Sequence, residues 1–243
     1  MAVQPTFVVG FFLCVKYVMI KIRHNCERGF AQPPRTGLID SYRSFSFEGY
    51  QDPAYRHWGP IKTINDDRTQ PGFETLWHEH KYLDILSYVV SGAVSHKDNL
   101  GNELTARAGQ VQHMWCGNGI WHSEANRSTE PNRYLQIWIM HKTQDQPKDM
   151  TPRYELVNRS NTFAPLPITY ANPNIVVYAG IMEHNVVNEH SAYLLVVEGS
   201  CRINGEILKE GSSAELYEQV TIERIGSTHI ILFELNNTNA FRR

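Results

Sequence analysis

The sequence predicts an all-β protein with few, short helices. Short runs rich in β-branched and aromatic residues dominate the chain, and Gly, Asn and Pro separate them. No stretch keeps a helical period over three turns. Two similar strand-and-turn segments also lie far apart in the sequence, which is typical of two related barrels in tandem rather than a solenoid.

The expected strands extend along the whole chain. They are Gly37–Phe47, Gly59–Asn65, Asp84–Val94, Tyr134–Met140, Ala192–Ile203 and Thr228–Leu235. Asn204-Gly205 predicts a two-residue hairpin turn, because both positions favour positive φ. The run Asn99-Leu-Gly-Asn102 indicates a longer hairpin loop.

An internal repeat supports two barrels. Tyr88-Val-Val-Ser-Gly92 resembles Leu195-Val-Val-Glu-Gly199 at an offset of 107 residues (Gly92 to Gly199), and a hairpin and a further glycine follow each. Chance similarity of two glycine-bounded strands is the alternative. We expect a first barrel over residues 19–142, a polar, proline-containing linker over 143–167 and a second barrel over 168–243.

Residues 1–18 are expected to be an N-terminal extension outside the barrels. Their apolar run, Phe7–Cys14, is too short to span a bilayer. No Lys or Arg precedes Lys16, so the basic region of a signal peptide is missing. An extra strand or arm on the surface is the alternative.

Composition indicates a globular protein without a direct nucleic-acid interface. Hydrophobic residues make up 42% of the chain, the net charge is −2, and no basic stripe is visible. The four cysteines form no CxxC pair, which favours reduced thiols and a cytoplasmic location over a disulfide framework. We expect no membrane segment.

Two histidine-containing pairs carry the candidate chemistry. His78 and His80 precede a strand, and His122 and Glu124 repeat the same i, i+2 spacing. In extended backbone, such residues project from one face about 6.5 to 7 Å apart, so each pair can lean onto one ion. The alternative is that the four residues are unrelated. The other histidines are interpreted as surface or packing residues: His24, His57, His96, His113, His141, His184, His190 and His229.

These segments resemble a known family. The spacing Gly72-x5-His78-x-His80-x3-Asp84 resembles the first cupin motif, and Gly109-x5-Trp115-x-Gly117 followed by His122 resembles the second. More narrowly, the chain resembles the pirin family, including bacterial pirin-like quercetinases. The matching segments are Asp40–Phe47, Ile64–Asp67, His96–Gly101, Gly117–Glu124 and Leu135–Trp138.

The resemblance implies two jelly-roll-type cupin barrels in tandem (a bicupin), with one divalent metal in the N-terminal barrel. Its ligands fall on His78, His80, His122 and Glu124. We expect Fe(II), although Mn, Co, Ni, Cu or Zn would also suit such a shell. At the repeat offset, His78 and His80 correspond to Asn185 and Val187, so the C-terminal barrel is expected to lack metal ligands.

The surroundings of the ligands depart from the family pattern. Glu79 stands where the family usually has Pro, and Asp84 where it usually has Glu. The family's Ser-Ala-Gly segment reads Trp115-Cys116-Gly117, and Trp121 replaces an Arg. Because these positions are expected near the mouth of the pocket, they put the substrate preference in doubt.

The resemblance implies a quercetin 2,3-dioxygenase-like oxidoreductase that opens a flavonol or similar aromatic substrate with dioxygen. Glu124 is the candidate catalytic residue, either as a fixed ligand or as the base for the substrate hydroxyl. Asp84 is a candidate acceptor for a ligand imidazole N–H, or else a surface carboxylate. Candidate pocket residues are Trp77, Trp115, Cys116 and Trp121, with core packing as the alternative for the tryptophans.

Two other function classes remain open at this stage. One is a non-enzymatic, metal-dependent and redox-sensitive regulator that acts through protein partners, as the resemblance also implies. The other is a storage or sugar-isomerase type of cupin, because one barrel hosts many chemistries. The pirin-like segments argue against this last class.

Overall fold

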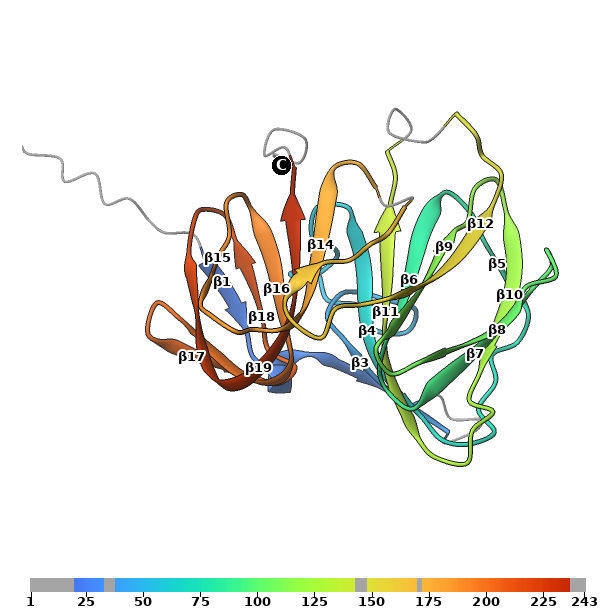
Figure 1. The fold of residues 1–243 in the computed structure, drawn as a ribbon, viewed down its shortest axis with the longest axis horizontal. Coiled ribbons are helices and arrows are strands. Elements are labelled where there is room, and N and C mark those ends of the chain that lie inside the picture. The colour runs from blue at the N-terminus through green and yellow to red at the C-terminus, as the bar shows by residue number, and fades with distance from the viewer. Residues whose placement is uncertain (1–19, 33–37, 143–147, 170–171, 237–243) are drawn as a thin grey trace, which may run out of the picture.

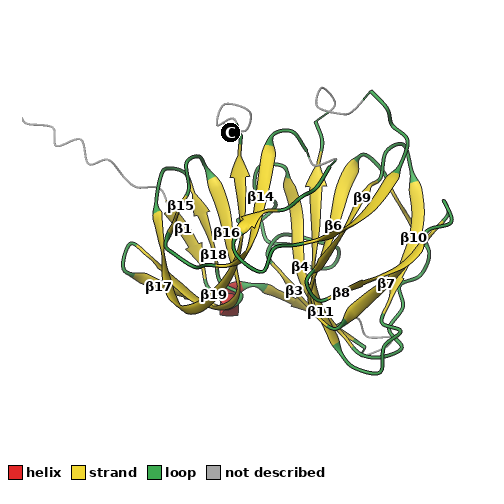
Figure 2. Ribbon diagram, in the orientation of Figure 1, coloured by secondary structure: helices red, strands yellow, loops and turns green. Residues whose placement is uncertain are grey.

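The computed structural model describes residues 20–32, 38–142, 148–169 and 172–236. These residues fold almost entirely as strands, and their one helix is the single 3-10 turn η1 (Asn25–Glu27) (Figure 2). The all-β prediction is therefore confirmed. The predicted extension over residues 1–18 lies outside the described residues. No described helix is long and apolar enough to cross a membrane.

Two antiparallel sheets build the N-terminal half (Figure 1). The first contains β2 (Gly29–Ala31), β3 (Ile39–Arg43), β4 (Ile61–Thr69), β6 (Leu83–Ser91), β9 (Gln110–Trp115), β11 (Asn132–Met140) and β12 (Arg153–Asn158), in the order β12-β9-β6-β11-β4-β3-β2. The second contains β5 (His78–His80), β7 (Ala93–Asp98), β8 (Glu103–Arg107) and β10 (Ile120–Ala125), in the order β5-β10-β7-β8.

One eight-stranded sheet builds the C-terminal half. Its strands are β1 (Ile20–Arg23), β13 (Ala164–Pro165), β14 (Ile175–Ile181), β15 (Val186–Val187), β16 (Ala192–Ile203), β17 (Glu206–Lys209), β18 (Ser213–Leu216) and β19 (Thr221–Leu235). The order is β1-β18-β16-β19-β14-β13, with β15 paired to β19 and β17 to β16. This sheet encloses an apolar cluster that includes Leu194, Val196, Cys201 and Ile230.

The turns follow the sequence signals. Asn204 and Gly205 have φ of 49° and 85° and join β16 to β17, as predicted. The repeated glycines, Gly92 and Gly199, both have positive φ, at 70° and 78°. A Cβ atom at Gly92 would lie 2.8 Å from the side chain of Asn132, and one at Gly199 would lie 2.2 Å from the carbonyl oxygen of Ser227. Both positions therefore need glycine for the same two reasons.

The predicted boundaries between the halves need correction. β1, expected in the first barrel, pairs with β18 of the C-terminal sheet. β12, expected within the linker, pairs with β9 from Arg153↔Trp115 to Asn158↔Gln110 and so belongs to the N-terminal half. Short polar strands such as β12 lack the β-branched, aromatic enrichment that sequence patterns use to identify strands.

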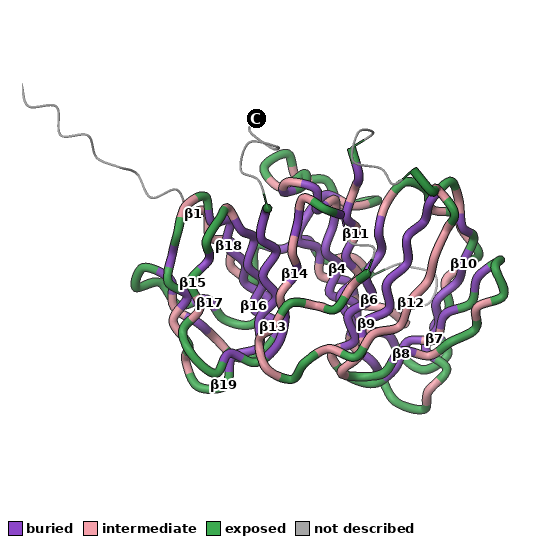
Figure 3. Tube along the Cα trace, turned by 45° about the horizontal axis from the view of Figure 1, so that its top comes forward, coloured by how far each residue is buried: buried purple, intermediate pink, exposed green. Residues whose placement is uncertain are grey.

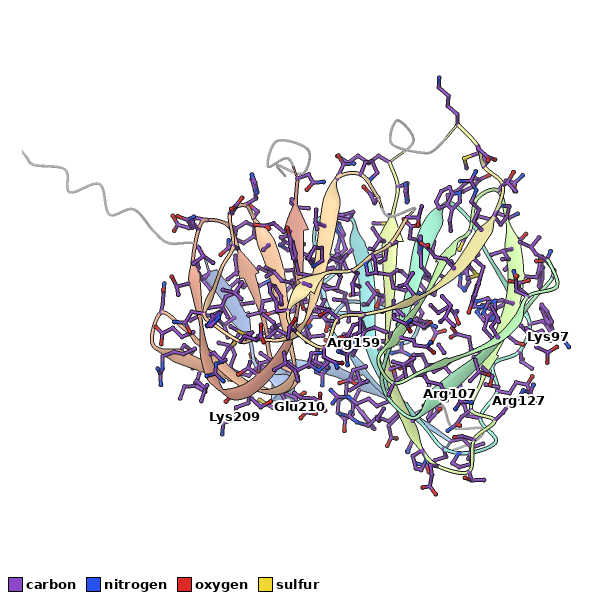
Figure 4. All side chains as sticks on the ribbon, viewed as in Figure 1. Lys97, Arg107, Arg127, Arg159, Lys209 and Glu210 are labelled. Atoms are coloured by element: carbon purple, nitrogen blue, oxygen red, sulfur yellow. The ribbon has the colours of Figure 1, made fainter. Side chains whose placement is uncertain are left out.

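A shared hydrophobic core joins the two halves. Phe45, Ile64 and Tyr88 from the N-terminal half lie in one buried cluster with Tyr193 and Phe233 from the C-terminal half. The buried tube segments accordingly run through both halves (Figure 3). At the rim of this junction Glu210 Oε1 forms an ion pair with Arg133 Nη1 at 2.9 Å. Figure 4 labels Glu210 and Arg159.

Candidate metal centre

Three histidines converge where β5 pairs with β10. The antiparallel register places His122 opposite His78, and Ile120 opposite His80. One ring nitrogen from each of His78, His80 and His122 lies within 4.8 Å of the other two. The ring centroids of His78 and His122 are 4.5 Å apart, and those of His78 and His80 are 4.7 Å apart. The i, i+2 spacing in β5 therefore does bring its two imidazoles together with His122.

The environment of His122 fits a metal ligand. Its side chain is fully buried, and neither ring nitrogen has a hydrogen-bond partner among the described residues. Burial, with the neighbouring imidazoles as a second cause, lowers the pKa of His122 to about 2. Burial also lowers the pKa of His80 to about 4. Neutral imidazoles with free lone pairs are the form in which histidine binds metals.

Glu124 extends this histidine cluster toward the opposite sheet. Its Oε1 accepts from the Ser87 hydroxyl at 2.9 Å and from Gln112 Nε2 at 3.2 Å. Its Oε2 accepts from Gln136 Nε2 at 2.6 Å. A carboxylate oxygen of Glu124 lies within 4.8 Å of ligand atoms on both His96 and His122. The space between the two sheets thus holds three imidazoles and an ordered carboxylate, a donor set that suits a divalent transition metal.

His96 belongs to this site, although the sequence analysis interpreted it as a surface or packing residue. It is 1% exposed, and its register partner across β7 and β10 is Glu124. Its Nε2 lies 3.0 Å from Asp98 Oδ2, and its Nδ1 lies 3.2 Å from Gln112 Nε2. The i, i+2 spacing of His96 and Asp98 is the signal that could have revealed it.

An apolar wall lies beside the histidines. The Trp138 ring is 4.6 Å from that of His80, and Phe47 packs edge-on against Trp138 at 4.9 Å. Tyr154 from β12 is tilted against His96 at 4.7 Å. The buried members of the wall are Ile85, Met114, Cys116 and Ile120. Sequence reasoning included Cys116 but missed Tyr154, because β12 was interpreted as linker. It also did not name Trp138 as a pocket residue, although the strand that carries it was predicted.

Asp84 does not contact a candidate ligand, contrary to the expectation. It accepts from His113 Nε2 at 2.8 Å and also from His141 Nε2. Leu83 and Ile85 belong to the apolar wall beside the histidines, and alternate residues of a strand project to opposite faces. Asp84 therefore faces away from the histidine cluster, and it forms a separate buried hydrogen-bonded group with His113 and His141.

Of the three tryptophans predicted near the pocket, Trp115 and Trp121 do not line it, and Trp77 stays a prediction. Trp115 is 1% exposed and packs on His141, 4.6 Å away, on the same far face as Asp84. Trp77 and Trp121 are 47% and 46% exposed. Trp121 pairs with Glu79 in the register and so projects from the outer face of β10, away from His122.

Fold and site together define a two-part, cupin-like β protein with a histidine-rich candidate metal centre in its N-terminal half. The Pirin family model matches residues 23–139, and the model for the quercetinase C-terminal cupin domain matches residues 180–235. The chain belongs to the pirin family.

Relatives and solved structures agree with this assignment. The chain is 31% identical over 235 residues to quercetin 2,3-dioxygenase of Escherichia coli K12, covering 89% of this chain and 99% of the relative. It is 29% identical to a pirin-like protein of Caulobacter vibrioides over 215 residues, covering 82% and 93%. The structure of the bacterial pirin YhhW from Escherichia coli in complex with nickel(II) superposes with a TM-score of 0.80 at 30% identity, covering 89% of this chain and 99% of that one.

Proposed function

We propose that this protein is a metal-dependent dioxygenase of the quercetin 2,3-dioxygenase type, which opens a flavonol or similar aromatic ring with dioxygen. The observation that carries the proposal is His122: its two buried nitrogens have no partner among the described residues, and one ring nitrogen from each of His78, His80 and His122 lies within 4.8 Å of the other two. A buried unpaired nitrogen costs about 1–3 kcal/mol, and coordination to an ion would remove that cost.

The proposed ligands are His78, His80, His122 and Glu124, with Fe(II) as the ion in the cell. The same donors accept Mn, Co, Ni, Cu or Zn, and the related YhhW structure contains nickel(II). When bound, such an ion supplies a Lewis-acidic, redox-active centre with open positions. The four proposed ligands come from two paired strands, β5 and β10, so the site is built on a rigid part of the fold.

The residues of the chain would bind and orient the substrate. Trp138, Tyr154 and Met114 form an apolar wall that suits a flat aromatic ring and excludes water. Three donors, Ser87, Gln112 and Gln136, fix the carboxylate of Glu124. This cage favours Glu124 as a fixed ligand over a base that swings away.

The described cysteines are all free, and unpaired cysteines support a cytoplasmic location for the protein.

Oxygen uptake with quercetin tests the proposal. We expect the iron- or manganese-loaded protein to consume dioxygen, and we expect His122→Asn to lose both the metal and the turnover. His57→Ala, an exposed histidine outside the cluster, is the matched control and should behave as wild type. No turnover with any first-row divalent metal, in protein shown to contain that metal, would exclude the activity.

A second function, regulation of a protein partner, is favoured by one specific observation. β5, which carries His78 and His80, is an edge strand, and the exposed Leu76, Trp77 and Tyr82 flank it. A partner protein that binds this exposed apolar surface would therefore respond to whether the ion is bound and to its oxidation state. A partner whose affinity differs between ferrous and ferric protein, and falls with Trp77→Ala, would support it; equal affinity in both states contradicts it.

A further inference from the structure

Two buried histidines lie against Glu124, and their hydrogen bonds separate their roles. Ligand atoms of His96, His122 and Glu124 all lie within 4.8 Å of one another, so proximity alone would make both histidines candidate ligands. Neither nitrogen of His122 has a hydrogen-bond partner in the described part of the chain. Both nitrogens of His96 are engaged, one with Asp98 and one with Gln112. A ring with two satisfied nitrogens has no lone pair left for an ion.

Asp98 determines which nitrogen of His96 carries the proton. Its Oδ1 accepts the backbone N–H groups of Leu100 and Asn102, at 2.9 and 3.0 Å, and its Oδ2 accepts from the Asn102 side chain. All three of these donors are N–H groups, so the Asp98 carboxylate acts as an acceptor toward each of them. His96 Nε2–H therefore donates to Asp98 as well, and His96 Nδ1 must accept.

The orientation of the Gln112 amide follows from this tautomer. Gln112 Nε2 lies 3.2 Å from His96 Nδ1 and 3.2 Å from Glu124 Oε1, and it donates one hydrogen to each of them. Gln112 Oε1 accepts from the Tyr154 hydroxyl at 3.2 Å. A flipped amide would place its oxygen against the Glu124 carboxylate and its NH2 against the Tyr154 hydroxyl. His96 and Tyr154 therefore hold Gln112 in the one orientation that donates to Glu124.

We infer that His96 is a positioning residue of the metal centre, acting from Asp98 through Gln112 on the carboxylate of Glu124. The inference rests on the metal site proposed above, but it does not depend on which reaction occurs there. Tyr154 of β12 contributes to the same chain from the opposite side. Since Ser87 and Gln136 also donate to Glu124, loss of His96 weakens the hold on the carboxylate without abolishing it.

An isosteric pair of variants tests the inference. Asn and Leu have nearly the same shape, but only His96→Asn keeps an acceptor near the Nδ1 position. We expect His96→Leu to bind Co(II) roughly 10-fold or more weakly, within the range of about 10–100-fold seen when partners of metal ligands are removed. His96→Asn should stay within about threefold of wild type. Affinity is measured by competition with a chelator, and the visible absorption of bound Co(II) reports whether the ligand geometry has changed.

The outcomes separate the possible roles. If His96 only packs against its neighbours, the His96→Leu variant binds Co(II) as tightly as His96→Asn or more tightly, and the inference is overturned. If His96 is a ligand, both variants lose the ion as His122→Asn does, which also overturns it. If wild type binds no Co(II), the proposed metal centre falls together with this inference, a result distinct from the other two. Should His96→Leu not fold, Tyr154→Phe is the second test: a weakening of a few-fold supports the inference, and unchanged affinity overturns it.

Discussion

At the scale of single residues, His78, His80 and His122 each bring one ring nitrogen within 4.8 Å of the other two. The i, i+2 spacing of His78 and His80 places these two donors on one strand face, and Glu124 as a ligand stays a prediction. Asp84 was misassigned because both faces of β6 are buried, so burial gave no sign of which face it takes. His96 was missed because a lone histidine on a strand is most often a packing residue, and its relation to Glu124 depends on strand pairing.

The position of Asp84 leads to a prediction that separates stability from metal binding. Asp84→Asn removes the carboxylate that accepts from His113 and His141. Because these groups are buried, we expect a loss of about 3–5 kcal/mol in the free energy of unfolding. Metal affinity should stay within about twofold of wild type, since Asp84 faces away from the cluster. A loss of metal affinity of roughly 10-fold or more, as expected when a hydrogen-bond partner of a metal ligand is removed, would contradict this. Urea unfolding and chelator competition measure the two quantities.

The buried carboxyl of Asp67 predicts a dependence of stability on pH. Burial raises the pKa of Asp67 to about 7 from 3.8, and the nearby Asp66 and Glu124 also raise it. The protonated carboxyl is favoured in the folded state, so its contribution is complete below pH 4 and is lost as pH rises through about 7. Asp67→Asn cannot ionise, so its stability relative to wild type should increase by a few kcal/mol between pH 4 and pH 8. Urea unfolding of metal-free protein checks this, and parallel pH profiles would contradict it.

At the scale of elements, the long strands were predictable and the short ones were not. β16 spans Ala192–Ile203, as predicted, whereas β5 and β12 have only three and six residues and mixed polarity. Both short strands are fixed by long-range pairing, β5 with β10 and β12 with β9, which local patterns do not contain. These two elements carry His78, His80 and Tyr154, so the part of the fold that local patterns describe least is the part that completes the candidate site.

The entry of the chain into β12 depends on Gly117. Its φ is +51°, and a Cβ there would lie 2.1 Å from the carbonyl oxygen of Met150. Gly101 has φ of +90° with nothing within 4 Å, so Gly101→Ala carries the backbone strain without the clash. We expect Gly101→Ala to cost about 1 kcal/mol and Gly117→Ala about 3 kcal/mol or more. Equal losses in urea unfolding would show that the contact with Met150 has no importance.

At the scale of the whole molecule, the shared core predicts that both halves unfold together. All five tryptophans, Trp58, Trp77, Trp115, Trp121 and Trp138, lie in the N-terminal half, and only Trp58 among them belongs to the buried cluster shared with the C-terminal half. Their fluorescence therefore reports mainly the N-terminal half. Far-ultraviolet circular dichroism reports both halves. Because Phe233 packs in the same cluster as Ile64 and Tyr88, we expect the two signals to share one midpoint.

The corresponding variant is Phe233→Ala. Although Phe233 lies in the C-terminal sheet, the substitution should lower the tryptophan midpoint by the equivalent of about 3–5 kcal/mol, as for other buried phenylalanines. Ile207→Ala, at an exposed position of the same sheet, is the control and should leave it unchanged. Two separated transitions, or a tryptophan midpoint insensitive to Phe233→Ala, would show that the halves are independent.

The pairing of β1 with β18 has a consequence for how the protein is made. The contact between Lys21 and Glu215 joins residues 194 positions apart. At about 5–20 residues per second, a ribosome needs roughly 10–40 s to synthesise the chain between them. During that time β1 has no partner strand and exposes an open edge, while the N-terminal half is already complete enough to fold. In the nascent chain β1 therefore stays unpaired until β18 has been synthesised. Aggregation during synthesis should begin at the open edge of β1.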